Sequence, residues 1–157
     1  MRISPSGRRD RVLGAIETPA LGIWCGALVG FAFVSAPLAF HIVGAFDVAR
    51  FAALTAATLA QLTICGDVLG GVAIVAALVR AAGAGERAGD LLRALLVAAA
   101  LGLATYQQRT IVPAMQSIAD VRSPDYRALH VRSSAVYGGV VLLVLVALVA
   151  SALRREE

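Results

Sequence analysis

The sequence predicts an all-α integral membrane protein, a four-helix bundle with both termini in the cytoplasm. The first observation is composition: mean hydropathy is +0.82, 59% of the 157 residues are hydrophobic and only 15% are charged. Soluble domains are about one quarter charged. The second is the presence of apolar stretches long enough to cross the hydrocarbon core, which takes about 20 helical residues. The third is that Arg residues gather at the ends of these stretches, where basic residues fix orientation.

We expect three regions along the chain. The first apolar run is about 27 residues long, which is too long for the core of a signal peptide, and no A-x-A cleavage site follows it. We therefore interpret it as an uncleaved first span. The predicted regions are an N-terminal arm (1–17), a transmembrane domain (18–153, with spans at about 18–44, 51–79, 91–110 and 131–153) and a tail (154–157).

The distribution of Arg predicts the orientation. With both termini inside, nine Arg residues lie on the inner side and five on the outer side. The positive-inside rule then places both ends in the cytoplasm. The inner residues are Arg2, Arg8, Arg9, Arg11, Arg80, Arg87, Arg93, Arg154 and Arg155, and the outer ones are Arg50, Arg109, Arg122, Arg127 and Arg132.

The first span carries two packing signals. Gly22, Gly26 and Gly30 are spaced four residues apart, so they share one helix face and allow close backbone approach. This face predicts a helix contact, either within the chain or between two copies. Pro37 lies near the outer end of the same span. Because Pro lacks an N–H and its ring clashes with the carbonyl of Phe33, it predicts a kink there.

Asp67 is the strongest anomaly, near the middle of the second span in TICGDVLGG. An ionised carboxylate at the bilayer centre costs roughly 3 kcal/mol, and we find no charged residue of another span at its depth from the helical rise. Gly70, Gly71 and Thr63 share its helix face, which we expect to point into the bundle. Two interpretations stay open. One is a proton- or ion-responsive site, and the other is a protonated Asp67 bonded to Thr63 or a backbone carbonyl.

The remaining polar residues of this span lie on a different face. Thr58, Gln61 and Cys65 form a second stripe, for which we expect hydrogen bonds between helices. Cys25 and Cys65 both lie in apolar runs without a CxxC or zinc-type spacing. We therefore expect them to pack as small hydrophobic residues.

Polar side chains also gather toward the outer ends of the spans. His41 ends the first span, Arg109 leaves the third, and His130 with Ser133 opens the fourth, with Tyr137 one turn further on. One interpretation is an interfacial hydrogen-bond network that closes the bundle. The other is an outer vestibule that binds a small ion, metal or lipid headgroup, with His130 as the titrating group, Arg109 as the anion-binding group and Asp67 beneath them.

Three short motifs resemble the small four-span family typified by transmembrane protein 205, a membrane domain of unknown function. The resemblance covers residues 18–153 and implies a four-span fold with no established reaction. One departure is Tyr137, because the family pattern has Asn seven residues after the His. The matching residues are Trp24, Pro37 and Phe40 in the first helix, Tyr106, Arg109, Thr110 and Met115 leaving the third, and Leu129, His130 and Ser133 opening the fourth.

We expect a small membrane protein that binds or moves a small ion or solute, or that supports a membrane partner. The alternative is a redox membrane subunit in which His41 and His130 hold haem or copper. We expect no enzyme, because no nucleophile–base pair, phosphate loop or HExxH motif is found. We assign no metal and no cofactor.

The expected partners follow from the same pattern. The bilayer is the solvent, and a second copy or another membrane protein is the candidate partner. The sequence pI is 9.8, but the basic residues lie at helix ends, so we expect no nucleic acid. All fourteen basic residues are Arg, which indicates a high-GC bacterial genome and hence the bacterial inner membrane.

Overall fold

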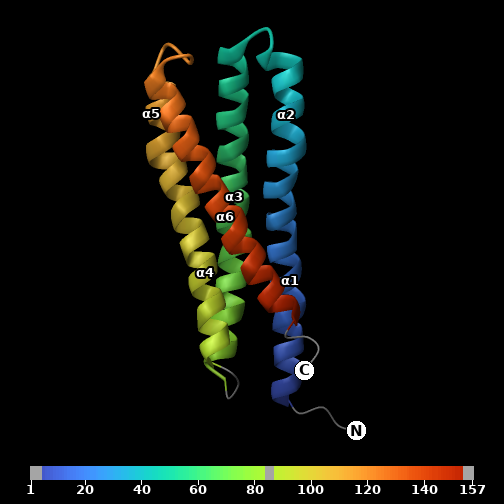
Figure 1. The fold of residues 1–157 in the computed structure, drawn as a ribbon. Coiled ribbons are helices and arrows are strands. Elements are labelled where there is room, and N and C mark those ends of the chain that lie inside the picture. The colour runs from blue at the N-terminus through green and yellow to red at the C-terminus, as the bar shows by residue number, and fades with distance from the viewer. Residues whose placement is uncertain (1–4, 84–86, 154–157) are drawn as a thin grey trace.

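The computed structural model describes residues 5–83 and 87–153, and these residues form helices and short connections with no strand among them. The all-α prediction is confirmed for this part of the chain, and the predicted tail lies outside it. The helices are longer than the predicted spans. Four are long and apolar enough to cross a membrane: Arg8–Gly44, Val48–Ala81, Arg87–Gln116 and Pro124–Leu153 (Figure 1).

The first long helix contains two widened turns. It runs through α1 (Pro5–Gly30), the π-helical η1 (Phe31–Ser35), α2 (Ala36–Ala39) and the π-helical η2 (Phe40–Gly44). In η1 the N–H of Ala36 donates to the carbonyl of Phe31, five residues earlier. Pro37 follows directly, and a π turn is one way for a membrane helix to absorb a proline. Where the sequence predicted a kink at Pro37, the structure has a widened turn, and the segments continue as one rod (Figure 1).

The third long helix also contains a widened turn before a proline. It runs through α4 (Arg87–Tyr106), the π-helical η3 (Gln107–Ile111) and α5 (Val112–Gln116), which contains Pro113. The N–H of Val112 donates to the carbonyl of Gln107 across the widened turn. Isolated π turns often accompany functional positions, and this one sets the direction of a buried polar side chain described below.

The other two helices are uninterrupted and capped by side chains. The helix α3 (Val48–Ala81) follows Asp47, whose carboxylate accepts the N–H of Arg50 at 2.9 Å. The helix α6 (Pro124–Leu153) follows Ser123, whose hydroxyl accepts the N–H of Tyr126 at 3.2 Å. Both caps satisfy N–H groups that a helix start leaves free.

The four helices form a four-sided bundle. The helices α1 and α4 each pack against both α3 and α6. The start of α1 and the end of α6 lie at one end of the bundle, here called the terminal end, and the connection to α3 and the start of α6 lie at the far end (Figure 1). The first turns of α1 belong to the segment predicted as an arm. There Arg9 Nη2 donates to the carbonyl of Val79 at 3.0 Å, so this part of α1 packs on the end of α3.

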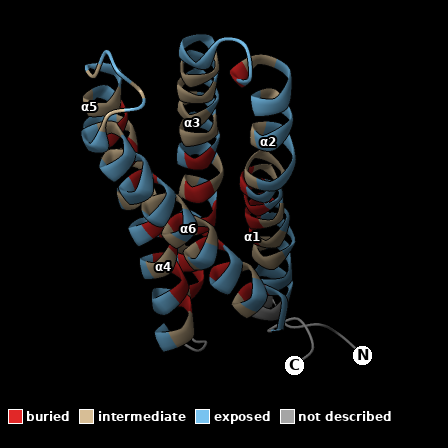
Figure 2. Cartoon of the chain, turned by 45° about the horizontal axis from the view of Figure 1, so that its top comes forward, coloured by how far each residue is buried: buried red, intermediate tan, exposed pale blue. Residues whose placement is uncertain are grey.

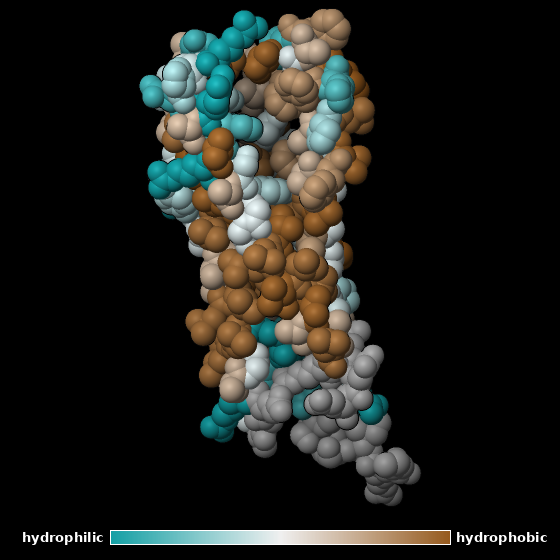
Figure 3. Space-filling view, viewed as in Figure 1, coloured by the Kyte–Doolittle hydropathy of each residue, from teal (hydrophilic) through white to brown (hydrophobic). Residues whose placement is uncertain are grey.

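The hydrophobic core lies in the half of the bundle nearer the terminal end, where α6 leans across toward α1 (Figures 1 and 2). Toward the far end the first helix has large exposed side chains, among them Phe33 at 75%. A broad hydrophobic band crosses the visible face (Figure 3), as lipid contact requires. The buried core residues are Leu21, Trp24, Cys25, Leu28, Ala73, Val97, Ala100, Val140, Val144 and Ala147.

Two glycines of α3 make room for the largest core side chain. Trp24 is 1% exposed, and a Cβ on Gly66 would lie 2.8 Å from its indole. A Cβ on Gly70 would lie 3.1 Å from the same ring. These glycines were not predicted to meet Trp24, although Gly70 was assigned to the inward face.

The glycine stripe of the first span has no close neighbour among the described residues. A Cβ on Gly22, Gly26 or Gly30 would meet nothing within 4 Å. Of the two alternatives, a contact inside the chain is therefore not found among the described residues. The stripe faces outward from the described part of the bundle.

Gly66→Ala should lower the free energy of unfolding by about 1–3 kcal/mol, because the new methyl group overpacks against the indole of Trp24. Gly26→Ala is the matched control. It should be neutral or stabilising by up to about 1 kcal/mol, because Ala is the better helix former and the space is open. Unfolding in detergent by SDS titration measures both, and equal effects would contradict the close contact.

Candidate functional site

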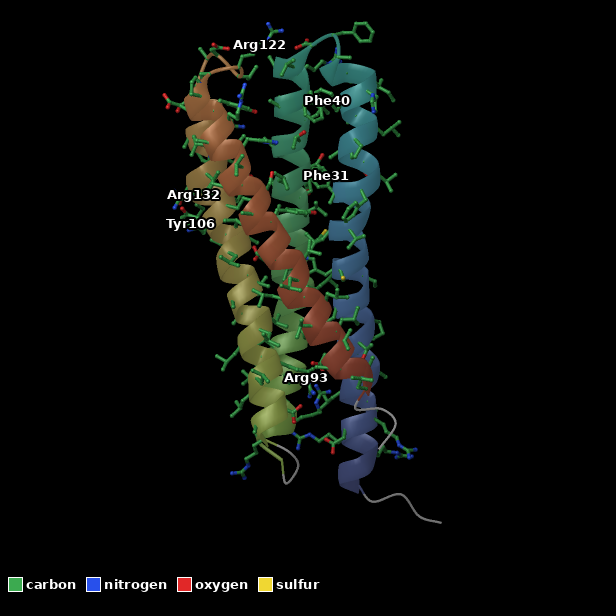
Figure 4. All side chains as sticks on the ribbon, in the orientation of Figure 1. Phe31, Phe40, Arg93, Tyr106, Arg122 and Arg132 are labelled. Atoms are coloured by element: carbon green, nitrogen blue, oxygen red, sulfur yellow. The ribbon has the colours of Figure 1, made fainter. Side chains whose placement is uncertain are left out.

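Four charged side chains are buried together at the terminal end of the bundle. This ion-pair cluster consists of Glu17 on α1, Arg80 on α3, and Asp90 and Arg93 on α4. Each is at most 8% exposed. Arg80 pairs with Glu17 and lies 3.1 Å from Asp90, and Arg93 pairs with Asp90 and lies 3.3 Å from Glu17. The cluster thus joins three helices, and Figure 4 labels Arg93 at this end of the bundle.

The charges of the ion-pair cluster balance, because two carboxylates face two guanidinium groups. Burying a charge costs several kcal/mol unless it is paired and hydrogen-bonded, and each guanidinium here meets two carboxylates. Beside the cluster, the hydroxyls of Thr18 and Ser151 are 2.9 Å apart and join α1 to α6. All four helices are therefore tied together at the terminal end.

Sequence reasoning missed this cluster. It counted Arg80 and Arg93 only as residues that set orientation, and it gave no role to Glu17 or Asp90. The sequence does contain a signal that indicates this cluster. Both acids directly precede apolar runs at the same predicted side of the membrane where Arg80 ends one. Acidic and basic residues at one depth on neighbouring spans predict pairing.

A second polar layer lies farther along the bundle. Gln107 is 5% exposed and donates from Nε2 to the hydroxyl of Ser133 at 3.0 Å, which joins η3 to α6. The hydroxyl of Tyr137 donates to the carbonyl of Leu28 at 2.7 Å, which joins α6 to α1. Ser133 and Tyr137 were predicted in the outer cluster. The structure makes them links between helices.

A small, mostly apolar cavity adjoins this layer. Its volume is about 20 Å³, which is enough for one water molecule. Gln108 Oε1 is buried with no hydrogen-bond partner among the described residues. A water that donates to this oxygen would satisfy it. The lining residues are Trp24, Leu28, Leu59, Leu62, Thr63, Ala104, Gln107, Gln108, Tyr137 and Val140.

The predicted outer vestibule is not assembled from its charged members. His41, Arg109 and His130 are all exposed. His130 stacks on Tyr126, with ring centroids 6.4 Å apart, and His41 lies edge-on to Phe40 at 6.3 Å. In the described part of the chain no contact joins the two histidines. No group of three or more His, Cys, Asp or Glu residues that could hold a metal ion occurs in that part either.

His130→Ala should leave membrane insertion unchanged and change the free energy of unfolding by less than about 0.5 kcal/mol, because the ring is exposed and stacks only on Tyr126. Ser133→Ala is the contrast, since it removes the partner of buried Gln107 and should cost about 1–3 kcal/mol. Expression in membranes and SDS unfolding measure both. A failure of His130→Ala to insert would make this residue architectural.

Asp67 lies on an exposed part of α3. The prediction that its face points into the bundle is therefore wrong for Asp67 itself. The reason is helix rotation, since Gly66 and Gly70 turn toward Trp24 and carry Asp67 to the side of the buried face. Thr63, one predicted partner, donates instead to the carbonyl of Leu59 at 2.9 Å. No hydrogen bond or ion pair joins Asp67 to another described residue.

The second polar stripe of α3 is exposed as well. Thr58, Gln61 and Cys65 all lie on the outer surface. Thr58 donates to the carbonyl of Leu54 in its own helix at 2.9 Å. The expected bonds between helices are thus absent from this stripe in the described part of the bundle. By contrast Cys25 is buried in the core, as expected for a small hydrophobic residue.

The fold and its polar layers define a small four-span integral membrane protein. Residues 20–124 match the family model of a domain of unknown function, DUF4149, so the chain belongs to this family. The match ends where α6 begins, so it includes Trp24 and Gln107 but not His130 or Ser133. No curated protein and no solved structure gives a significant match.

Proposed function

We propose that this protein supports a partner inside the membrane, and that it binds the partner through the exposed face of α3. The observation that carries the proposal is that Asp67, near the middle of a membrane span, is exposed and pairs with no other described residue. A carboxyl group that faces lipid is costly at this depth. A polar group from another chain would remove this cost by hydrogen bonding.

The depth of Asp67 follows from the helical rise. Arg50 and Arg80 are about 45 Å apart along α3 at 1.5 Å per residue, and a bilayer with its headgroup regions is about 40–45 Å thick. Asp67 lies about 20 Å from Arg80 on the same measure. This places it within a few Å of the bilayer centre, beyond the reach of water or headgroups.

The partner role is better supported than ion or solute movement. The buried charges of the ion-pair cluster are matched with one another, and the cavity beside Gln108 has room for only about one water molecule. These groups hold the helices together. Asp67 differs from them because its hydrogen-bonding capacity is directed away from the bundle.

Location and orientation are part of the proposal. The Arg count favours a bacterial inner membrane with the terminal end of the bundle in the cytoplasm. Two of the nine inner Arg residues, Arg80 and Arg93, are buried in ion pairs, which leaves seven against five. The motifs of the first and third helices also keep the resemblance to the transmembrane protein 205 family.

Site-specific photo-crosslinking in native membranes tests the partner role. A photoreactive amino acid replaces Ile64, which is 55% exposed on α3, or Leu142, which is 60% exposed on α6 at about the same predicted depth. We expect a protein adduct from position 64 and only unmodified chain from position 142. Absence of an adduct at position 64, or equal adducts at both positions, would refute a partner on this face.

A further inference from the structure

We propose that the partner on α3 is a second copy of this chain, and that the two Asp67 carboxyls hydrogen-bond to each other across a twofold axis. This inference rests on the proposed partner role and names the occupant of the same face.

Asp67 lies in a regular seam of α3. The seam positions are separated alternately by four and three residues, the repeat that keeps one face of a helix against a partner helix. Ile64 and Leu78 are 55% and 46% exposed, Asp67 is exposed, and Ala60 and Gly71 are half-buried. Ile74 at the edge of the seam is also half-buried, because it packs in part against the hydrophobic core. We call these residues the α3 seam: Ala60, Ile64, Asp67, Gly71, Ile74 and Leu78.

Gly71 allows the two backbones to approach one turn from Asp67. A Cβ at Gly71 would meet nothing within 4 Å, so no contact with another described residue requires its small size. In contrast, Gly66 and Gly70 face Trp24. Small residues on a lipid-facing seam permit close helix contact between chains, and close contact is needed for a side chain as short as Asp to reach its counterpart.

A twofold axis along the membrane normal brings equal positions together. Two copies inserted in the same orientation form an isologous interface in which each seam residue meets itself. Asp67 then faces Asp67 of the second copy at the same depth. A carboxylic acid both donates and accepts hydrogen bonds, so the two side chains satisfy one another without a basic group. No described Arg of this chain contacts Asp67. The carboxyl group of Asp67 in a second copy can take that place, because each carboxylic acid donates one hydrogen bond and accepts another.

Disulfide trapping in native membranes tests this dimer. Ile64→Cys is introduced together with Cys65→Ser, and Leu142→Cys in the same background is the matched control. Cys25 remains, because it is buried in the core. On mild oxidation we expect the position 64 variant to give a product of twice the chain mass, and the position 142 variant to stay monomeric. Two differently tagged chains should appear together in the product.

The role of Asp67 is tested in the same background. Asp67→Leu should lower trapping through position 64 by about tenfold, which corresponds to loss of one hydrogen bond between membrane helices. Asp67→Asn should retain trapping, because an amide also donates and accepts. SDS unfolding of both variants shows whether each chain still folds. Equal trapping in Asp67→Leu and the parent would overturn the carboxyl pair.

The outcomes separate the two proposals. Trapped dimer from position 64 supports both. A photo-adduct at position 64 with a different protein, and no trapped dimer, would retain the partner role and overturn the second copy as occupant. Neither adduct nor dimer from this position would overturn both, since Asp67 would then face lipid alone.

Discussion

Arg80→Ala should lower the free energy of unfolding by about 3–5 kcal/mol, the range for breaking a buried ion pair by removing one partner. The substitution leaves Glu17 and Asp90 with Arg93 as their only remaining partner in the ion-pair cluster. It also releases α3 from its charged contacts with α1 and α4. SDS unfolding in detergent measures the loss, and we expect it to exceed that of the other single charge removals at the terminal end.

Arg87→Ala is the matched control for Arg80→Ala. Arg87 begins α4 at the same end of the bundle but is exposed, so its removal should change stability by less than about 0.5 kcal/mol. Replacing all four members of the ion-pair cluster by apolar residues of similar size should cost less than Arg80→Ala alone, because no charge is left unpaired. If Arg80→Ala were as mild as Arg87→Ala, water would have to reach the remaining carboxylates.

The ion-pair cluster shows which features of a membrane protein are hard to predict from its sequence. Apolar length and Arg placement are properties of single segments, so the four spans follow directly from them. Pairing of Glu17 with Arg80 depends on which helices are neighbours and how each is rotated. A periodicity of 3.6 residues gives a helix face but does not say which face turns inward when lipid, too, is apolar.

Asp67 illustrates the same limit. Its depth in the span was predicted, and so was the lack of a charged partner at that depth. The prediction that Asp67 points inward was wrong, because the sequence does not reveal that Trp24 packs against Gly66 and Gly70. In the structure Gly66 and Gly70 face this indole ring, and Asp67, next to Gly66, lies on the exposed side of α3. A hydrophilic residue in a span therefore does not by itself mark the inside of a bundle.

Trp24→Ala should lower the free energy of unfolding by about 3–5 kcal/mol, the usual cost of removing a buried aromatic side chain. Trp24 is 1% exposed, packs against α3 and lines the cavity beside Gln108. Its removal enlarges that cavity and takes away the ring that Gly66 faces, while Gly70 still lies against Leu101. Trp24→Phe should cost less, since a ring remains. SDS unfolding measures both variants.

The double variant of Trp24→Ala and Gly66→Ala tests whether the destabilisation caused by Gly66→Ala comes from contact with the indole ring. In the parent, Gly66→Ala is unfavourable because its methyl group meets the indole. Once Trp24 is Ala that clash is gone, and Ala favours the helix over Gly by about 0.5–1 kcal/mol. Gly66→Ala should therefore change sign and stabilise the Trp24→Ala chain, with a coupling energy of about 1–3 kcal/mol. If Gly66→Ala lowered the free energy of unfolding equally in both backgrounds, α3 would require Gly66 for a reason other than the indole ring. Contact with Trp24 would then not explain why Asp67 faces lipid.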